Sequence, residues 1–336
     1  GVGCVILDEF HERPVEAELS LALLRQARAL VRPDLCLVLM SATLDLAPLA
    51  DQLDQATVVS TSGRSHPVKV IHQVPRREES LQRQVLRGLE EHWLPERGRA
   101  ETVLVFLPGA REIEAVQAAI GATAWGADLV CLPLHGQLPL AGQERAMAPA
   151  KDPRGKVVVA TSIAESSLTI EGVRLVVDSG LSRGNRFDPG TGMNGLITFT
   201  ASQASAEQRR GRAGRLAPGR CLRLWGAAGH QRRPLFDLPE LLQADPLPLA
   251  LELAQWGAPD GDRLPWIQPP PAGPLRQAAE QLRLLDAIDA SGRITPHGRA
   301  MAKLGLHPRL AHMLLRAERC GWLELACALA VLLEER

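Results

Sequence analysis

Two acidic residues directly after an apolar run are the first candidates for chemistry in this sequence. Asp8 and Glu9 follow residues 2–7 and open the segment D-E-F-H-E-R. One carboxylate of such a pair can hold a hydrated Mg²⁺, while its neighbour orients and deprotonates an attacking water molecule. An acidic pair after a strand is by itself more often a solvated loop or a helix cap, so the surrounding sequence must decide.

Hydroxyl groups follow a second apolar run in the same way. Residues 35–40 lead into Ser41, Ala42 and Thr43. If both runs are neighbouring parallel strands, these hydroxyls and the acidic pair lie at one edge of the sheet, where α/β folds bind ligands. The hydroxyls could then link a nucleotide site to a neighbouring domain. The alternative is that Ser41 or Thr43 caps the next helix.

The segment Q-R-R-G-R-A-G-R at 208–215 is the most informative one. Six arginines and one acid occur between residues 207 and 223, whereas the whole chain has 38 basic and 38 acidic residues, so attraction for a polyanion must be local. If the segment is helical, Gln208, Arg212 and Arg215 share one face, and two guanidinium groups could clamp a nucleotide γ-phosphate. A solvated basic helix or a nucleic-acid patch is the alternative, and two glycines weaken the helix prediction.

A polar loop with five hydroxyl groups follows the apolar run 156–160. Such a loop can bind a phosphodiester backbone without reading bases, although most polar loops after strands bind nothing. His135, after the run 129–134, could line a channel for nucleic acid, but a lone histidine at a strand end is more often structural. Residues 185–200 contain D-P-G-T-G between two stretches with apolar residues, which predicts a β-hairpin. Such a hairpin could act as a wedge that separates nucleic-acid strands, although ordinary hairpins are far more common.

The elements that would position these residues follow from periodicity. Up to about residue 225, short apolar runs alternate with amphipathic stretches, the pattern of parallel strands joined by crossover helices. Strands are expected at 2–7, 35–40, 68–72, 102–107, 129–134, 156–160 and 174–178, with helices at 15–31 and 80–93. Further on, proline-rich connectors separate helices expected at 247–256, 275–287, 296–304, 309–316 and 322–333. Residues 289–293 form a turn that could hold a small wing.

Composition excludes several classes of protein. The six cysteines show no C-x-x-C pair and no Cys/His cluster at zinc spacing, which favours free thiols in a reducing, cytoplasmic compartment. No apolar stretch approaches the roughly 18 residues of a membrane span. Gly1 leads at once into an apolar run, and we therefore expect the chain to begin inside a domain.

Taken in order, four segments resemble motifs II, III, V and VI of superfamily 2 helicases, with the DEAH-box branch as the close match. They are D-E-F-H-E-R (8–13), S-A-T (41–43), A-T-S-I-A-E-S-S-L-T-I (160–170) and Q-R-R-G-R-A-G-R (208–215). The segments I-T-P-H-G-R-A-M-A (294–302), L-H-P-R-L-A-H-M-L-L (306–315) and L-A-V-L-L-E-E-R (329–336) resemble the winged-helix and ratchet region of bacterial HrpB-type helicases.

The resemblance implies an α/β fold of RecA-like parallel-sheet domains, the first one truncated, followed by an α-helical winged-helix and ratchet region. The expected domains are 1–61 (the C-terminal part of the first RecA-like domain), 62–228 (the second), 229–305 (winged-helix-like) and 306–336 (the start of a ratchet-type domain).

The resemblance also implies roles for the matching residues. Asp8 would bind Mg²⁺ through water, Glu9 would activate the hydrolytic water, and His11 would couple this site to the second domain. Ser41 and Thr43 would transmit the nucleotide state, Gln208 would position the water, and Arg212 and Arg215 would be arginine fingers. The residues that would contact a single nucleic-acid strand are Thr161, Ser162, Ser166, Ser167, Thr169 and His135.

Some positions depart from the family. Ser162 stands where Asn is common, Ser166 where Thr is common, and Arg210 where a small residue is usual. The phosphate-loop motif G-x-x-x-x-G-K-[ST] is missing from the 336 residues. We therefore expect it upstream in a longer protein and expect this chain alone to be inactive.

The expected function is an ATP- and Mg²⁺-dependent helicase that acts on nucleic acid, with RNA favoured over DNA, no membrane partner and protein partners unknown. A helicase-like module that binds nucleic acid without turnover is the main alternative. A small GTPase-like switch would leave the downstream helical region unexplained.

Overall fold

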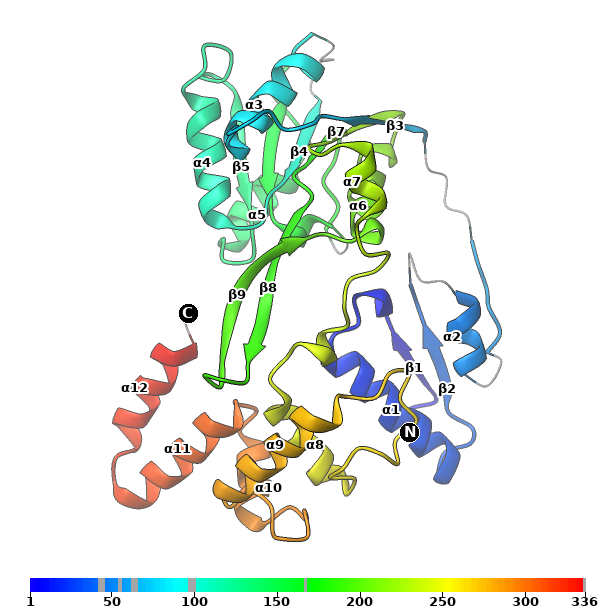
Figure 1. Cartoon of the computed structure of the whole chain (residues 1–336), viewed down its shortest axis with the longest axis vertical. Helices are drawn as coiled ribbons and strands as arrows, with labels where there is room; N and C mark the ends of the chain where they lie inside the picture. The colour runs from blue at the N-terminus through cyan, green and yellow to red at the C-terminus, as the bar shows by residue number, and fades with distance from the viewer. Residues whose placement is uncertain (42–45, 54–55, 62–65, 96–100, 166–167, 335–336) are drawn as a thin grey trace. The chain divides into compact units, whose positions relative to one another are not determined.

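The computed structural model describes residues 1–41, 46–53, 56–61, 66–95, 101–165 and 168–334. They group into two compact units (Figure 1). The first unit comprises Gly1–Thr57, Asn185–Gly195 and Leu238–Arg336, and the second comprises Val58–Gly184 and Leu196–Asp237.

The second unit is built on a six-stranded parallel sheet with the strand order β3-β10-β7-β4-β6-β5. Its strands are β3 (Val68–His72), β4 (Thr102–Phe106), β5 (Val130–Leu134), β6 (Lys156–Ala160), β7 (Val173–Asp178) and β10 (Gly219–Arg223). The strands predicted at 68–72, 102–107, 129–134, 156–160 and 174–178 are confirmed to within one residue at each end.

Both faces of this sheet are covered, which explains why the strands β4 and β6 are buried at every position and almost entirely apolar. Alternate residues of β4 enter different cores: Val103 and Val105 pack beneath α3 (Leu81–His92) and α4 (Ala110–Gly121), whereas Leu104 and Phe106 share the opposite core with Ala146 of α5 (Leu140–Met147). After β6 comes the short 3₁₀ helix η2 (Ser162–Ala164), and α6 (Gln203–Gly211), η3 (Arg212–Gly214) and α7 (Ala227–Gln231) complete the unit.

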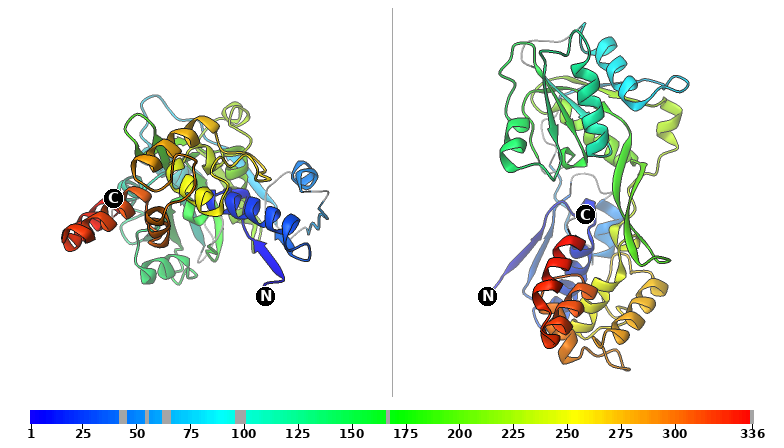
Figure 2. Two further views of the ribbon diagram at one scale, coloured as in Figure 1. Left: turned by 90° about the horizontal axis from the view of Figure 1, so that it is seen from below. Right: turned by 90° about the vertical axis from the view of Figure 1, so that its left-hand side faces the viewer.

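A two-stranded ribbon formed by β8 (Leu181–Asp188) and β9 (Met193–Thr200) confirms the predicted hairpin (Figures 1 and 2). The carboxylate of Asp188 accepts hydrogen bonds from the N–H of Gly190 (2.9 Å) and the hydroxyl of Thr191 (3.0 Å). Gly192 closes the turn at a φ of +66°, a conformation that favours glycine. The hairpin begins four residues before the predicted position 185.

The first unit combines a small parallel pair with helices. The pair, β1 (Cys4–Leu7) and β2 (Cys36–Leu39), is accompanied by η1 (Phe10–Glu12), α1 (Val15–Leu30) and α2 (Leu46–Gln52). The later elements are η4 (Glu240–Leu242), α8 (Pro246–Trp256), α9 (Ala272–Leu284), α10 (Pro296–Lys303), α11 (Pro308–Cys320) and α12 (Leu323–Glu334). Ala22 of α1 lies in one apolar core with Leu253, Leu282 and Met301.

The turn predicted at 289–293 is confirmed. An antiparallel bridge joins Ile288 to Ile294, and Gly292 has a φ of +80°. The hydroxyl of Ser291 and the backbone N–H of Arg293 donate to Asp289, which lowers the pKa of that carboxyl to about 2. The predicted end of the preceding helix at 287 is wrong: α9 ends at Leu284, because Asp286 adopts the left-handed conformation (φ 56°).

In the parts of the chain that the structure describes, we find no helix both long and apolar enough to cross a bilayer.

Candidate functional site

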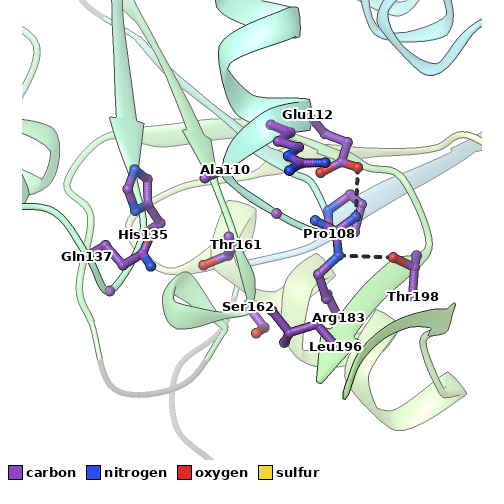
Figure 3. A pocket seen from close by; sticks show the side chains of 13 residues that line it. Pro108, Ala110, Glu112, His135, Gln137, Thr161, Ser162, Arg183, Leu196 and Thr198 are labelled. Carbon is purple, nitrogen blue, oxygen red and sulfur yellow. Dashed lines mark hydrogen bonds and ion pairs between the residues drawn. The ribbon is translucent and has the colours of Figure 1, made fainter. Parts of the chain in front are cut away.

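A pocket of about 740 Å³ lies beyond the carboxyl ends of β4, β5 and β6 in the second unit (Figure 3). It brings together three residues that the sequence predicted as nucleic-acid contacts, His135, Thr161 and Ser162. The start of α4 and the base of the β8–β9 hairpin complete its wall, with Pro108, Gly109, Ala110, Arg111, Glu112, Gly136, Gln137, Arg183, Leu196 and Thr198.

Backbone hydrogen bonds at the strand ends hold the wall of the pocket together. The N–H of Leu107 donates to the carbonyl of Ala160 (2.8 Å), and the N–H of Thr161 donates to the carbonyl of Leu134 (3.1 Å). The three neighbouring strands therefore end at the same level, so that polar residues far apart in sequence meet at the edge where parallel sheets bind ligands.

The N-terminus of α4 faces the pocket without a side-chain cap. Gly109 is the N-cap residue of α4. The free backbone N–H groups at this end of the helix and the positive end of the helix dipole together favour binding of an anion. A Cβ at this position would lie 2.2 Å from Nη1 of Arg183. A larger residue at this position would therefore require that guanidinium to shift.

The arginine-rich segment differs from the prediction of one continuous helix. Gln208 lies in α6, but α6 ends at Gly211 and residues 212–214 form a tighter 3₁₀ turn, so Arg212 and Arg215 are not placed by α-helical spacing. Gly214 lies against β3, where a Cβ would be 2.6 Å from the carbonyl oxygen of His66. This close approach leaves no room there for a residue with a side chain.

Arg212 and Arg215 both contact the loop after β6. Arg212, only 5% exposed, donates through its guanidinium to the carbonyl oxygens of Glu165 (2.9 Å) and Leu168. Arg215 is exposed and donates to the hydroxyl of Thr169 (2.9 Å). Thr169 is not among the residues that line the pocket.

Arg209 forms a buried ion-pair network beside them. Its side chain is 1% exposed and pairs with Asp178 (2.9 Å) and Glu165 (3.0 Å). Burial alone would lower the pKa of Arg209, but the two carboxylates outweigh it, and the pKa is raised. Burial also raises the pKa of Glu165, which Arg209 opposes only in part. The network ties the 160–170 loop to α6.

The acidic pair lies in the first unit, directly after β1. Leu7 and Leu39 are partners in the parallel pair, and the N–H of Phe10 donates to the carbonyl of Met40 (2.9 Å). The acidic loop and Ser41 therefore meet at one strand edge, as the sequence predicted. Glu9 adopts a left-handed conformation (φ 48°), its N–H donates to Asp8 (2.8 Å), and its carboxylate lies 3.4 Å from Nδ1 of His11.

Two segments of the chain match family models of helicases. Residues 83–217 match the helicase conserved C-terminal domain, and residues 278–306 match the winged-helix helicase associated domain (HA2). The chain is 44% identical over 335 residues to the ATP-dependent RNA helicase HrpB of Escherichia coli. The crystal structure of E. coli DEAH/RHA helicase HrpB superposes on all of this chain with a TM-score of 0.91. These matches support the resemblance of the whole chain to DEAH-box helicases of the HrpB type.

The chain spans about two fifths of the length of HrpB, 41% of the sequence and 42% of the crystallised chain. It is also 35% identical over 325 residues to the pre-mRNA-splicing factor ATP-dependent RNA helicase prp22 of Schizosaccharomyces pombe, covering 94% of this chain and 27% of that protein. Its fold agrees with the prediction of a RecA-like parallel-sheet domain and an α-helical winged-helix region.

A Mg²⁺ ion fits the DEAH-box acidic loop only with help from other ligands. Asp8 is exposed at the strand end, where its carboxylate can reach a hydrated ion. Among the described residues, no group of three or more His, Cys, Asp or Glu side chains could hold a metal on its own. This suits Mg²⁺, which keeps several waters and binds through one or two carboxylates together with substrate phosphates.

Some of the expected site residues lie outside the described residues, namely Thr43, Ser166 and Ser167. Others were not expected: Gly109, Glu112, Arg183 and Thr198 line the pocket. The segment F-L-P-G-A-R-E-I at 106–113 carries a signal for the first two, since a strand ends there and a helix begins at a glycine. Nothing local points to Arg183, because its partners are distant in sequence.

Proposed function

We propose that the chain is the part of an ATP-driven helicase that holds a single strand of nucleic acid, RNA rather than DNA, in the pocket of the second unit. The observation that carries the proposal is the composition of that pocket: the N-terminus of α4, which has no side-chain cap, the hydroxyls of Thr161 and Ser162, and the guanidinium groups of Arg111 and Arg183. This wall suits a phosphodiester backbone.

For the nucleotide, we propose that Asp8 binds Mg²⁺ through water, Glu9 activates the hydrolytic water, and His11, Ser41 and Thr43 respond to nucleotide state. Gln208 would position the water, with Arg212 and Arg215 as arginine fingers. ATP and Mg²⁺ would supply the phosphate and the metal charge for this chemistry. The G-x-x-x-x-G-K-[ST] motif does not occur in the 336 residues, so we propose turnover only for a longer protein that contains it.

The remaining expectations accompany this proposal. Ser166, Ser167, Thr169 and His135 remain proposed contacts to the strand, and the β8–β9 hairpin a proposed aid to strand separation. The division at 61, 228 and 305 remains our proposed domain organisation, and a cytoplasmic location is a prediction from the sequence. A binding module without turnover is the alternative; the presence of Glu9, Gln208, Arg212 and Arg215 together favours an enzyme.

Binding of a labelled single-stranded oligouridylate to the 336-residue chain tests the proposal. Thr161→Ala should raise the Kd by about tenfold, since a hydrogen bond to a charged phosphate contributes about 1.5 kcal/mol or more. Thr57→Ala removes an exposed hydroxyl from the first unit and is the matched control. Absence of binding, or a Thr161→Ala change no larger than the control, would contradict the proposal. Oligothymidylate of equal length compares DNA with RNA through the 2′-hydroxyl.

A further inference from the structure

Arg183 is one of two arginines that line the pocket, with the exposed Arg111, and the charge of Arg183 is already neutralised within the unit. Its Nη2 donates to Oε1 of Glu112 (2.7 Å), and its Nε donates to the hydroxyl of Thr198 (3.0 Å) (Figure 3). Both members of the ion pair are partly exposed, at 25% and 27% of their side chains. Water and ligands in the pocket can therefore reach the pair.

Glu112 is unusual in a pocket that would bind a polyanion, because a carboxylate repels phosphate. It lies in the first turn of α4, three residues after the N-cap Gly109. Its second oxygen, Oε2, is buried and has no hydrogen-bond partner among the described residues. Burial of this oxygen without a hydrogen-bond partner costs free energy of desolvation, which offsets part of the stabilisation from the ion pair between Glu112 and Arg183.

The guanidinium of Arg183 also covers the place where an anion would bind. A Cβ built on Gly109 would lie 2.2 Å from Nη1 and 3.0 Å from Cζ of Arg183, so the group lies against the N-cap of α4. The backbone N–H groups at this helix end favour phosphate. A phosphate at this end of α4 would lie beside the guanidinium and within reach of its donors.

We propose that Arg183 exchanges Glu112 for a backbone phosphate when a strand enters the pocket, so that Glu112 acts as a built-in competitor of the nucleic acid. The inference rests on the proposed function of the pocket and adds to it how that site is regulated. Arg183 belongs to β8 and its second partner Thr198 to β9. Any shift of the guanidinium therefore acts on the base of the β8–β9 hairpin, which makes Arg183 a link between strand binding and the hairpin.

The inference predicts opposite effects for the two partners of one ion pair. In the 336-residue chain, Arg183→Ala should weaken binding of single-stranded oligouridylate by about tenfold and reduce the slope of log Kd against log salt by about 0.7. Glu112→Gln, which keeps the shape of the side chain, should tighten binding by about threefold or more, since it removes the competitor. In the Arg183→Ala background, Glu112→Gln should change binding by less than about twofold, because the two effects are coupled.

Glu114→Gln is the matched control, since Glu114 lies on the same helix and is exposed. It should leave the Kd within about twofold. This control separates the loss of a competing carboxylate at position 112 from the general effect of removing one negative charge from the protein. Arg183→Lys should recover part of the affinity, and unchanged thermal unfolding of each variant confirms its fold. If Glu112→Gln weakens binding or leaves it unchanged while Thr161→Ala still weakens it, the proposed exchange by Arg183 is wrong. The proposal that the pocket binds a nucleic-acid strand would stand in that case. If no variant and no wild-type chain binds the strand, both proposals fail.

Discussion

Arg209 is the most deeply buried charge in the arginine-rich segment, and its role is structural. It pairs with Asp178 and Glu165 at 2.9 and 3.0 Å and also donates to the hydroxyl of Ser182 (2.6 Å). Removal of one partner from a buried ion pair leaves the remaining charges without compensation in a medium of low polarity. The loop that carries Thr161 would then lose one of its connections to α6.

We therefore expect Arg209→Ala to lower the free energy of unfolding by about 3–5 kcal/mol. Arg210→Ala is the matched control, because the neighbouring Arg210 is 35% exposed and pairs with Glu207 on the same helix. That change should cost no more than about 1 kcal/mol. Urea unfolding followed by circular dichroism measures both values. Equal losses for the two variants would mean that the buried network contributes little.

The sequence predicts the residues of the pocket that follow a strand and misses those that do not. Thr161, Ser162 and His135 were identifiable because each comes directly after an apolar run. Arg183 was not, because Glu112 is 71 residues away in sequence and only the fold brings the two together. For the same reason the sequence could not separate the buried Arg209 from its exposed neighbours, since Asp178 lies 31 residues upstream.

At the scale of elements, the sequence predicts five of the six strands in the sheet of the second unit and misses β10, whose sequence G-R-C-L-R contains two arginines. The boundaries of the buried strands β4 and β6 lie where apolar runs stop, and the sequence shows those points directly. Helix ends depend on single backbone conformations instead. The left-handed Asp286 ends the turn after α9, and the close packing of Gly214 on β3 accompanies the change from α6 to the 3₁₀ turn. Neither the backbone conformation of Asp286 nor the packing of Gly214 can be read from the periodicity of the sequence.

The start of α3 is held by a paired carboxylate that gives the second unit a pH dependence. The guanidinium of Arg87 donates two hydrogen bonds to Glu79, at 2.8 and 2.7 Å, and the N–H of Arg76 donates a third (2.9 Å). These bonds lower the pKa of Glu79 from 4.5 to about 2. A carboxyl whose pKa is lowered in the folded state stabilises the fold above its unfolded pKa, and the contribution is lost as the pH falls from about 4.5 to about 2.

Glu79→Gln should accordingly lower the Tm at pH 7 by roughly 2–4 °C, and the difference from the wild type should vanish as the pH approaches 2. Thermal unfolding at several pH values between 7 and 2 follows the change. Glu78→Gln is the control, because the side chain of Glu78 is 85% exposed. A difference that stays constant across this range would show that Glu79 acts through shape and not through its charge.

At the scale of the whole molecule, the residues that we propose for ATP hydrolysis are divided between the two units. Asp8 and Glu9 belong to the first unit, whereas Gln208, Arg212 and Arg215 belong to the second. The proposed hydrolysis therefore depends on residues from both units. The chain spans 41% of the length of HrpB and does not contain the G-x-x-x-x-G-K-[ST] motif, so this dependence is testable in a longer protein that carries both.

The most direct test of the helicase proposal is RNA-stimulated phosphate release by the full-length helicase to which we propose this chain belongs. Glu9→Gln should lower kcat by about 10²–10⁴-fold, the usual contribution of a general base, while oligouridylate binding is retained. Glu16→Gln, at an exposed position in the first turn of α1, should leave kcat within about twofold. Turnover by Glu9→Gln within about threefold of the wild type would contradict the assignment of the acidic loop to ATP hydrolysis.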